Sequence, residues 1–402
     1  MADVDDDRNP FLPALIARGE HFADRESEVA HLLRVYSSPG SRLVVYGERR
    51  MGKSSALDRA AEIYRSEDGR VAIASLATST DAADAAKSLL LAVREALGRD
   101  WREAFESIIG RLKGSVVITP GVLVGQPPSV RLTLDLSEEQ PETSLVPEAL
   151  SSIHQELEDR DLTLALVIDE FQRLHAWGGE DAEWALKAAI EQHPRIAYVL
   201  AGSQKSLIEA MISRKGRALW KQTEVLPFGP IPADEMSTWI HQQASRTGAN
   251  FSLEACDRIV ELAGPRTRDI VQLAREAWFE SQQLERVLTE HIDAARDQAI
   301  RVQDALYAAQ WRSLSPASQR ILRALTQEND LMLTSTAALA RFSLGPKSTV
   351  SHTAGRLVDD EVLVPRDAGG YEFDDPFFQR WIELRVLPTL GLSAADGSSS
   401  NG

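Results

Sequence analysis

The stretch LVVYGERRMGKSS, residues 43–55, decides the fold class of this chain. A short apolar run ends at Gly47, four residues separate it from Gly52, and a lysine and a serine follow. These residues match the pattern Gly-x4-Gly-Lys-Ser/Thr, a loop that turns its backbone N–H groups around phosphates at the positive end of a helix. Residues 53–65 have helical apolar spacing, so the sequence predicts a strand, a phosphate-binding loop and a helix in that order.

The predicted loop assigns a role to its residues. Lys53 would reach the β- and γ-phosphates of a nucleotide, and the Ser54 hydroxyl would ligate Mg²⁺. We therefore expect ATP and Mg²⁺ as cofactors, with ADP as the second nucleotide partner. The residues expected to contact the nucleotide are Gly47, Glu48, Arg49, Arg50, Met51, Gly52, Lys53, Ser54 and Ser55. The alternative is an ordinary strand–turn–helix in which Lys53 lies at the surface.

A second motif lies at the end of the apolar run LTLALVIDE, residues 162–170. Parallel strands present their C-terminal ends to one edge of a sheet, so Asp169 is expected to meet the Mg²⁺ of Ser54 there. Glu170 would then act on the attacking water as a general base. Acidic residues also cap ordinary strands and helices, so this assignment depends on the phosphate-binding loop.

A third motif, AYVLAGSQKSL at residues 197–207, places Ser203 between a buried strand and a helix. If this strand neighbours the strand before Gly47, Ser203 would lie near the γ-phosphate as a polar sensor. Serine is also strongly preferred at helix N-caps. The sequence leaves both interpretations open.

Strands and helices alternate through the first half of the chain. Besides the strand before the loop, apolar or β-branched runs predict strands at 71–76, 162–170, 196–203 and 224–231. This alternation predicts an α/β fold of the P-loop NTPase class, with a parallel sheet and helices on both faces. Residues 115–137 interrupt this alternation of strands and helices. Their own alternation of residue types around glycine and proline predicts an inserted β-hairpin.

The C-terminal third changes to helical periodicity. One long helix is expected over LTEHIDAARDQAIRVQDALYAAQW, residues 288–311. Three shorter helices and a hairpin with a glycine turn follow, which is the pattern of a winged helix-turn-helix domain. The expected organisation is an N-terminal extension (1–21), a P-loop core (22–232), a helical lid (233–310), a winged helix (311–386) and a flexible tail (387–402).

Composition narrows the classes of function. The 402 residues carry a formal net charge of −16, which argues against a protein coated in basic surface for nucleic acid. No apolar run reaches the ~18 residues of a membrane span, and the acidic N-terminus lacks the features of a secretory signal. We therefore expect no membrane partner and a cytoplasmic location. The single cysteine, Cys256, is expected to pack in the core.

The chain resembles the archaeal-type ATPase group of the STAND class, within the wider AAA+ relatives of P-loop NTPases. The resemblance runs from about residue 22 to residue 381, and its most specific pieces are VVYGERRMGKSS and LVIDEFQRL. The supporting pieces are FADRESEVAHLL, LAGSQ, GRALWKQTEVLPFGPI and YEFDDPFFQRW. The resemblance implies ATP binding and slow hydrolysis coupled to a conformational switch, in a core followed by a helical lid and a winged helix.

The resemblance also implies roles for single arginines. Arg25 stands in the family's Asn-Arg-Glu or Gly-Arg-Glu box near the nucleotide, with Asp24 at the position of Asn or Gly. Arg217 matches an arginine before the fifth strand, which would approach a neighbouring subunit's γ-phosphate or lie solvated in a loop. Arg266 and Arg268 occupy the position of a sensor arginine in the lid, and the sequence does not choose between them.

Two classes of function compete. The first is an ATP-driven switch that assembles with itself or binds partner proteins. It is motivated by three cations without an evident partner in the sequence, Arg214, Lys215 and Arg217. The second is a DNA-binding ATPase resembling origin-recognition or transposition-regulator proteins. Its contacts with duplex DNA would come from winged-helix residues Lys347, His352 and Arg356.

Overall fold

The computed structural model describes residues 9–13, 22–97, 103, 106–109, 114–119, 129–134, 142–282, 284–366 and 369–391. The chain divides into two compact units. A sheet unit comprises residues 14–231 together with 266–268, and a helical unit comprises residues 1–13, 232–265 and 269–402. The division therefore falls within the first turn of one helix, α10 (Thr267–Ser281).

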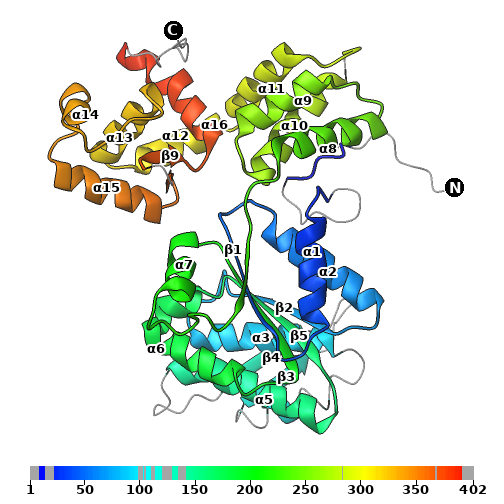
Figure 1. Ribbon diagram of the computed structural model, residues 1–402. Helices are drawn as coiled ribbons and strands as arrows, with labels where there is room; N and C mark the ends of the chain where they lie inside the picture. Colours follow the sequence, from blue (N-terminus) through cyan, green and yellow to red (C-terminus); the bar gives the residue numbers. More distant parts are fainter. Residues whose placement is uncertain are drawn as a thin grey trace. The chain divides into compact units, whose positions relative to one another are not determined.

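A five-stranded parallel sheet forms the centre of the sheet unit (Figure 1). The strand order is β2-β5-β6-β1-β7, so the first strand lies inside the sheet between the last two. The strands are β1 (Arg42–Tyr46), β2 (Val71–Ser75), β5 (Leu164–Asp169), β6 (Ile196–Gly202) and β7 (Glu224–Pro227). Each of the predicted strand segments contains one of these strands, and the predicted P-loop NTPase class of fold is confirmed.

Helices cover both faces of this sheet because successive side chains of β1, β2, β5 and β6 enter opposite cores. Leu43 and Val45 of β1 pack in the core formed with α1 (Glu26–Tyr36) and α2 (Lys53–Ser66). Val44, between them, packs in the core on the opposite face. The helices of that face are α3 (Ala82–Ala96), α5 (Leu145–Asp159), α6 (Arg173–Ile190) and α7 (Lys205–Ser213). Burial on both faces explains why these strands read as continuous apolar runs.

The segment of the predicted hairpin contains β3 (Gly114–Thr119) and β4 (Ser129–Leu134), which pair antiparallel. Other expectations lie outside the described residues, namely the turn of this hairpin and the chain ends at 1–8 and 392–402. No helix in the described part of the chain combines the length and the apolar character needed to cross a membrane.

The helical unit begins with a bundle of α8 (Ala233–Arg246), α9 (Leu253–Ala263), α10 and α11 (Thr289–Val302). Cys256 is fully buried in this bundle, as expected, and burial raises the pKa of its thiol to about 12. Phe11 lies in the expected N-terminal extension, of which the structure describes residues 9–13. Its ring is fully buried, with centroids 5.8 Å from Trp239 and 6.5 Å from Phe251. The side chain of Phe11 thus packs in the bundle although the sequence around it has no apolar periodicity.

The expected long helix over 288–311 is wrong, because the structure has two helices. α11 ends at Val302 and α12 (Asp304–Ser313) begins after Gln303, whose φ of −93° and ψ of 7° are not helical. Tyr307 of α12 stacks on Phe378 with ring centroids 5.6 Å apart. Apolar spacing continues across the break, so periodicity alone could not reveal a single non-helical residue.

The winged-helix segment contains three helices followed by a short hairpin, as predicted. Its elements are α13 (Pro316–Gln327), α14 (Thr336–Arg341), α15 (Lys347–Asp359), β8 (Leu363–Pro365), β9 (Tyr371–Phe373) and α16 (Pro376–Trp381). Ser315 and Ser335 cap α13 and α14 with hydrogen bonds from backbone N–H groups to their hydroxyl oxygens. A 3₁₀ turn at Pro388–Leu390 occupies the start of the segment expected to be a flexible tail.

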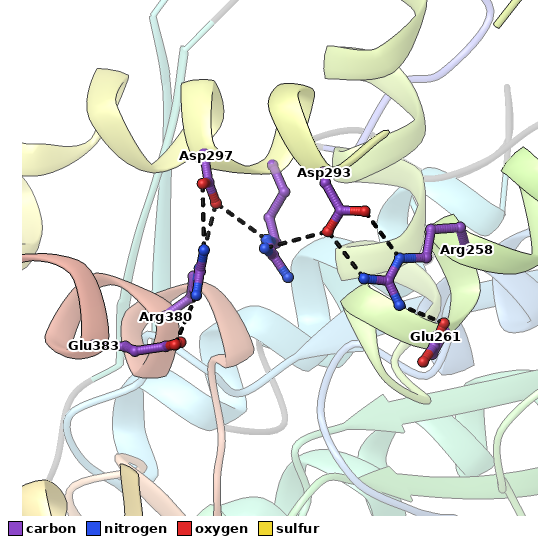
Figure 2. A network of polar contacts seen from close by, with 7 residues as sticks. Arg258, Glu261, Asp293, Asp297, Arg380 and Glu383 are labelled. Carbon is purple, nitrogen blue, oxygen red and sulfur yellow. Dashed lines mark hydrogen bonds and ion pairs between the residues drawn. The ribbon is translucent and has the colours of Figure 1, made fainter. Parts of the chain in front are cut away.

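An ion-pair network joins three helices of the helical unit (Figure 2). Its members are Arg258, Glu261, Asp293, Arg296, Asp297, Arg380 and Glu383. Arg258 of α9 donates two hydrogen bonds to Asp293 of α11, at 3.0 and 3.1 Å. Arg380 of α16 donates two to Asp297 of α11, both at 3.3 Å. The carboxylates of α11 therefore connect the bundle to the last helix of the winged-helix segment.

A buried histidine precedes β6 in the sheet unit. The Nδ1 atom of His193 lies 2.7 Å from the Tyr198 hydroxyl, and its ring stacks on His154 at 4.8 Å between centroids. Burial lowers the pKa of His193 to about 4, and the neighbouring His154 acts in the same direction. The folded sheet unit therefore holds this imidazole neutral at pH values where the unfolded chain protonates it.

We predict that the sheet unit loses stability in acid through His193. The unfolded histidine binds its proton near pH 6.5 and the folded one near pH 4, so the free energy of unfolding falls as pH drops through this interval. The loss should reach up to about 3 kcal/mol. Urea unfolding at a series of pH values should show a shallower dependence for His193→Gln than for the parent. His352→Gln, at an exposed histidine of α15, should behave like the parent. An unchanged dependence in His193→Gln would contradict the prediction.

Candidate active site

The candidate site lies where three parallel strands end. β1 pairs with β6 in a register that sets Tyr46 opposite Gly202. β5 pairs with the other side of β6, so that Asp169 lies opposite Ala201. The segments that follow β1, β5 and β6 therefore leave the sheet at the same edge. The strand before Ser203 does neighbour the strand before the glycine-rich loop, which is the condition for a sensor role.

Two glycines shape the loop between β1 and α2. A Cβ atom on Gly47 would lie 2.2 Å from the carbonyl oxygen of Phe228, so a larger residue does not fit at this position. Gly52 has a φ of 87°, in the left-handed region that glycine adopts without strain. α2 begins at the next residue, Lys53. The loop therefore leads directly into a helix N-terminus, where backbone N–H groups favour a bound phosphate.

Lys53 is the buried cation of this loop, with 6% of its surface exposed. Its ammonium group donates hydrogen bonds to the carbonyl oxygens of Gly47, at 2.8 Å, and Glu48, at 2.5 Å. Burial lowers the pKa of Lys53 to about 8, against the opposing effect of the carboxylates of Glu170 and Asp169. These contacts argue against the alternative of a surface lysine, because the charge lies inside the loop beside two acids.

Ser54 and Asp169 come together as the sequence predicts for a metal site. The Ser54 hydroxyl donates to a carboxylate oxygen of Asp169 over 3.3 Å, although the residues are 115 positions apart. Burial raises the pKa of the Asp169 carboxyl, and the charge of Glu170 raises it further. A hydroxyl and a partly buried carboxylate are oxygen ligands of the kind that suits Mg²⁺. A divalent cation would also relieve the repulsion between the two acids.

Glu170 is held by its neighbours on both the backbone and the side chain. Its φ of 56° is unusual for a residue with a side chain, and its N–H donates to Asp169 at 3.0 Å. Its side-chain oxygen Oε2 accepts a hydrogen bond from the Ser203 hydroxyl at 2.8 Å. Arg49 of the loop approaches the same hydroxyl at 3.4 Å. The hydroxyl of Ser203 after β6 thus contacts both Glu170 after β5 and Arg49 of the loop after β1.

The N-cap interpretation of Ser203 is wrong. The residue at the N-cap of α7 is Gln204, and no side chain caps this helix. The hydroxyl of Ser203 instead donates to Glu170. Its role as a sensor remains a proposal that this contact supports.

Gln172 belongs to the site but was not predicted from the sequence. It is 4% exposed, and its side-chain amide donates to the same Glu170 oxygen that Ser203 reaches. The only signal in the sequence is its place in the motif LVIDEFQRL, two residues after the glutamate. Gln172 lies two residues after Glu170 in a turn. A turn has no regular period, so the spacing of the two residues could not predict that their side chains meet.

Arg25 supports the loop from outside it. The guanidinium is 5% exposed and donates to the carbonyl oxygens of Met51, at 3.0 Å, and Gly229, at 2.5 Å. It also lies over the ring of Phe228, 5.0 Å from its centroid. Arg25 therefore ties the loop to the segment after β7. Its expected contact with nucleotide remains a proposal.

The structure separates the two candidate sensor arginines. Arg266 is 2% exposed and its guanidinium meets the carboxylate of Glu48 at 3.2 Å. The side chain of Arg268 is exposed, whereas its backbone N–H donates to the carbonyl oxygen of Arg50 at 3.1 Å. Residues 266–268 therefore contact the phosphate-binding loop within the sheet unit. Within the described part of the chain, the side chain of Arg266 bonds to a loop residue, whereas Arg268 contacts the loop through its backbone.

Arg217 corrects the expectation of a cation without a partner in its own chain. It is 9% exposed and donates two hydrogen bonds to the buried carboxylate of Glu183, one of them at 3.0 Å. Glu180 lies 3.6 Å away, and His175 also contacts Glu183. Glu183 lies on α6, 34 residues before Arg217, so no local pattern could predict the pair. Breaking such a pair costs about 3–5 kcal/mol, so Arg217 contributes to the stability of the fold. Its expected approach to a neighbouring subunit's γ-phosphate remains a proposal.

The remaining predicted residues are Ser55 and the three candidate DNA contacts. Ser55 lies in the first turn of α2, beside the loop. The three candidate DNA contacts all lie on α15 and are exposed: Lys347, His352 and Arg356.

Two family models match the chain. One is described as an ATPase domain predominantly from Archaea and matches residues 22–273. The other is described as a probable winged helix domain and matches residues 305–384. No curated protein matches the chain.

Solved structures share the fold. The Walker-type ATPase PABY2304 of Pyrococcus abyssi is 17% identical, with a TM-score of 0.60 over 93% of this chain and 99% of that one. The Aeropyrum pernix ORC2 protein, solved in ADPNP–ADP complexes, is 15% identical, with a TM-score of 0.53 over 94% and 96%. The Aeropyrum pernix ORC1 protein, solved in complex with DNA, is 16% identical, with a TM-score of 0.51 over 95% and 97%.

The first family model spans more than half of the 402 residues, including the loop, the acidic pair and Arg266. It coincides with a parallel sheet whose strand ends carry the residues that a phosphate-transfer site needs. The chain is therefore a P-loop ATPase and belongs to the family of ATPase domains found predominantly in Archaea.

Proposed function

We propose that the chain hydrolyses ATP at this edge of the sheet and uses its nucleotide state as a switch for self-assembly or for binding a partner protein. The observation that carries the hydrolysis site is a chain of hydrogen bonds. It runs from Ser54 to Asp169, from Asp169 to the backbone of Glu170, and from Glu170 to Ser203. These contacts bring residues from three separate segments into one place.

Each of these residues has a distinct task in the proposed reaction. Lys53 would exchange its two carbonyl acceptors for oxygens of the β- and γ-phosphates, since opposite charges attract strongly in buried surroundings. Ser54 and Asp169 would hold Mg²⁺, which neutralises phosphate charge when it is bound with ATP. Glu170 would accept the proton of the attacking water, and Ser203 would keep the Glu170 carboxylate in place.

We predict that Glu170→Gln lowers the turnover number for ATP at least about 100-fold. The amide has nearly the shape of the carboxylate but cannot take a proton from water. The affinity for ATP should stay within about threefold of the parent, because Glu170 is not expected to bind phosphate. Phosphate release measures turnover, and titration of a fluorescent ATP analogue measures affinity.

Two lysine variants provide controls for this measurement. Lys53→Ala should abolish binding of the analogue, because the phosphates would lose their buried counter-charge. Lys221→Ala, at an exposed lysine before β7, should bind and turn over like the parent. Turnover by Glu170→Gln at the parent's rate would show that Glu170 is structural and would refute the proposed hydrolysis site.

The proposed switch begins with Arg266. The loop that would receive the phosphates also holds residues 266–268, through the contacts of Glu48 with Arg266 and of Arg50 with Arg268. Phosphate oxygens would compete with the Glu48 carboxylate for the guanidinium of Arg266, and ATP offers one phosphate more than ADP. A ligand shifts an equilibrium only by interacting differently with its two states, and this competition supplies such a difference. We therefore propose Arg266 as the sensor arginine.

The sheet unit includes only the first turn of α10, and the rest of this helix belongs to the helical unit. A change at Arg266 would therefore enter the helical unit along a continuous helix. Within that unit, the network around Asp293 and Asp297 connects the bundle with α16 (Figure 2). These contacts support a helical unit that responds as one body and presents a changed surface to a second copy or to a partner protein.

We predict that Arg266→Ala uncouples α10 from the nucleotide. In a Glu170→Gln background, amide hydrogen exchange over residues 267–281 should differ about fivefold or more between ATP and ADP. Adding Arg266→Ala should remove this difference even at ATP concentrations that saturate the double variant. Arg268→Ala serves as the matched control and should keep the difference. A persistent difference in Arg266→Ala would refute its sensor role, and mass photometry of the same samples would report whether the ATP state assembles.

A second candidate function is binding of duplex DNA. The observation that favours it is the exposure of Lys347, His352 and Arg356 on α15, the third helix of the winged-helix segment. His352 and Arg356 are one helical turn apart and share a face. A relative of the same fold, the Aeropyrum pernix ORC1 protein, was solved in complex with DNA. The overall charge of −16 opposes this function unless the contact is confined to α15.

If α15 binds DNA, Lys347→Ala and Arg356→Ala should each weaken binding to a duplex by a similar factor for different sequences. Each should reduce the slope of log affinity against log salt by about one. Fluorescence anisotropy at several salt concentrations, with and without ATP, provides the measurement. Arg341→Ala on α14, where the arginine pairs with Glu328, is the control. The absence of salt-dependent binding in the parent would exclude this second function.

A further inference from the structure

Two donors hold the same oxygen of Glu170. Ser203 donates its hydroxyl to Oε2 at 2.8 Å, and the side-chain amide of Gln172 donates its Nε2 to this oxygen as well. Gln172 is 4% exposed and lies directly before α6, whose first residue is Arg173. The second oxygen of the carboxylate, Oε1, is then the one left to meet water. The proposed general base thus has one oxygen fixed and one available.

Gly202 provides the space that Gln172 occupies. A Cβ atom on Gly202 would lie 2.1 Å from Oε1 of Gln172 and 2.6 Å from the end of the Ile208 side chain. The φ of Gly202 lies outside the left-handed region, so its backbone would accept other residues. The glycine is therefore required by size, at the last position of β6 beside the site.

The amide of Gln172 is a poor choice for packing alone. In the part of the chain that the structure describes, its Oε1 is buried and has no hydrogen-bond partner. A buried polar atom without a partner costs about 1–3 kcal/mol, which an apolar side chain of similar length would avoid. The hydrogen bond from Nε2 to Glu170 is the one recorded contact that a methionine here could not make.

We propose that Gln172 is a positioning residue for Glu170, seated against Gly202, and that it holds the carboxylate ready for the attacking water. This inference rests on the proposed role of Glu170 as general base. Glu170 has a positive φ, so its side chain starts from an uncommon backbone geometry and depends on the two donors for its orientation. Gln172 acts through Glu170, which accepts the hydrogen bond of its side-chain amide.

The test replaces Gln172 with methionine, which fills a similar space without an N–H donor. We expect kcat to fall about tenfold, since one hydrogen bond to a charged group is lost. The KM for ATP should stay within about twofold, and the thermal midpoint should be unchanged or higher, because the unpaired buried oxygen is removed. Gln192→Met, at an exposed residue after α6, is the control and should leave kcat unchanged.

Double variants separate positioning from general packing. In the Glu170→Gln background, Gln172→Met should cause no further loss of kcat, because the base on which it acts is absent. Gly202→Ala should lower kcat by displacing Gln172, and Gly202→Ala should add nothing to the loss already caused by Gln172→Ala. Ile208→Val combined with Gly202→Ala relieves the contact with Ile208 and should not restore kcat.

The outcomes distinguish the inference from the proposed function. If Glu170→Gln turns over like the parent, the proposed function fails and the inference fails with it. If Glu170→Gln is slow but Gln172→Met keeps the parent's kcat, the inference alone is overturned. A loss of kcat in Gln172→Met that accompanies a lower thermal midpoint and recurs in the Glu170→Gln background would also overturn it. If Gln172→Met fails to fold, Gly202→Ala and its combination with Gln172→Ala decide by the same criteria.

Discussion

The pairing of β6 between β1 and β5 is the constraint on which the rest of the structure depends. It aligns the ends of three strands that are distant in the sequence, so that a lysine, a serine and two acids meet at one edge. Two glycines at the ends of the neighbouring strands β1 and β6 make this approach possible. Gly47 lets the loop pass Phe228, and Gly202 lets Gln172 reach the carboxylate of Glu170. Backbone geometry thus sets the positions of all the groups proposed to act on ATP.

Burial in the site destabilises the charged forms of two of its ionisable groups when no nucleotide is bound. Burial lowers the pKa of Lys53 and raises that of Asp169, so each charge is less stable here than in water. Phosphate and Mg²⁺ would bring charges of the opposite sign to both. A ligand of complementary charge would therefore stabilise the charged forms of both groups when it binds.

The sequence predicted the features that are encoded locally. Short patterns identified the loop, the acidic pair and the five strands, and periodicity identified the winged-helix segment. Contacts between distant segments could not be read in this way. Arg217, which follows α7, pairs with Glu183 of α6. Phe11 is buried against residues more than 200 positions away, and the choice between Arg266 and Arg268 depends on burial. The contact of Gln172 with Glu170 could not be predicted, because it is made within a turn and a turn has no regular period.

A crystal structure of the chain with Mn²⁺ and a non-hydrolysable ATP analogue tests the central claim most directly, because Mn²⁺ can be located by its anomalous scattering. The account predicts a metal peak beside the Ser54 hydroxyl and the Asp169 carboxylate. It also predicts that the ammonium group of Lys53 leaves the carbonyl oxygens of Gly47 and Glu48 for the phosphates. The account would be contradicted by a nucleotide bound elsewhere, or by a Lys53 that keeps its carbonyl contacts while the analogue is bound.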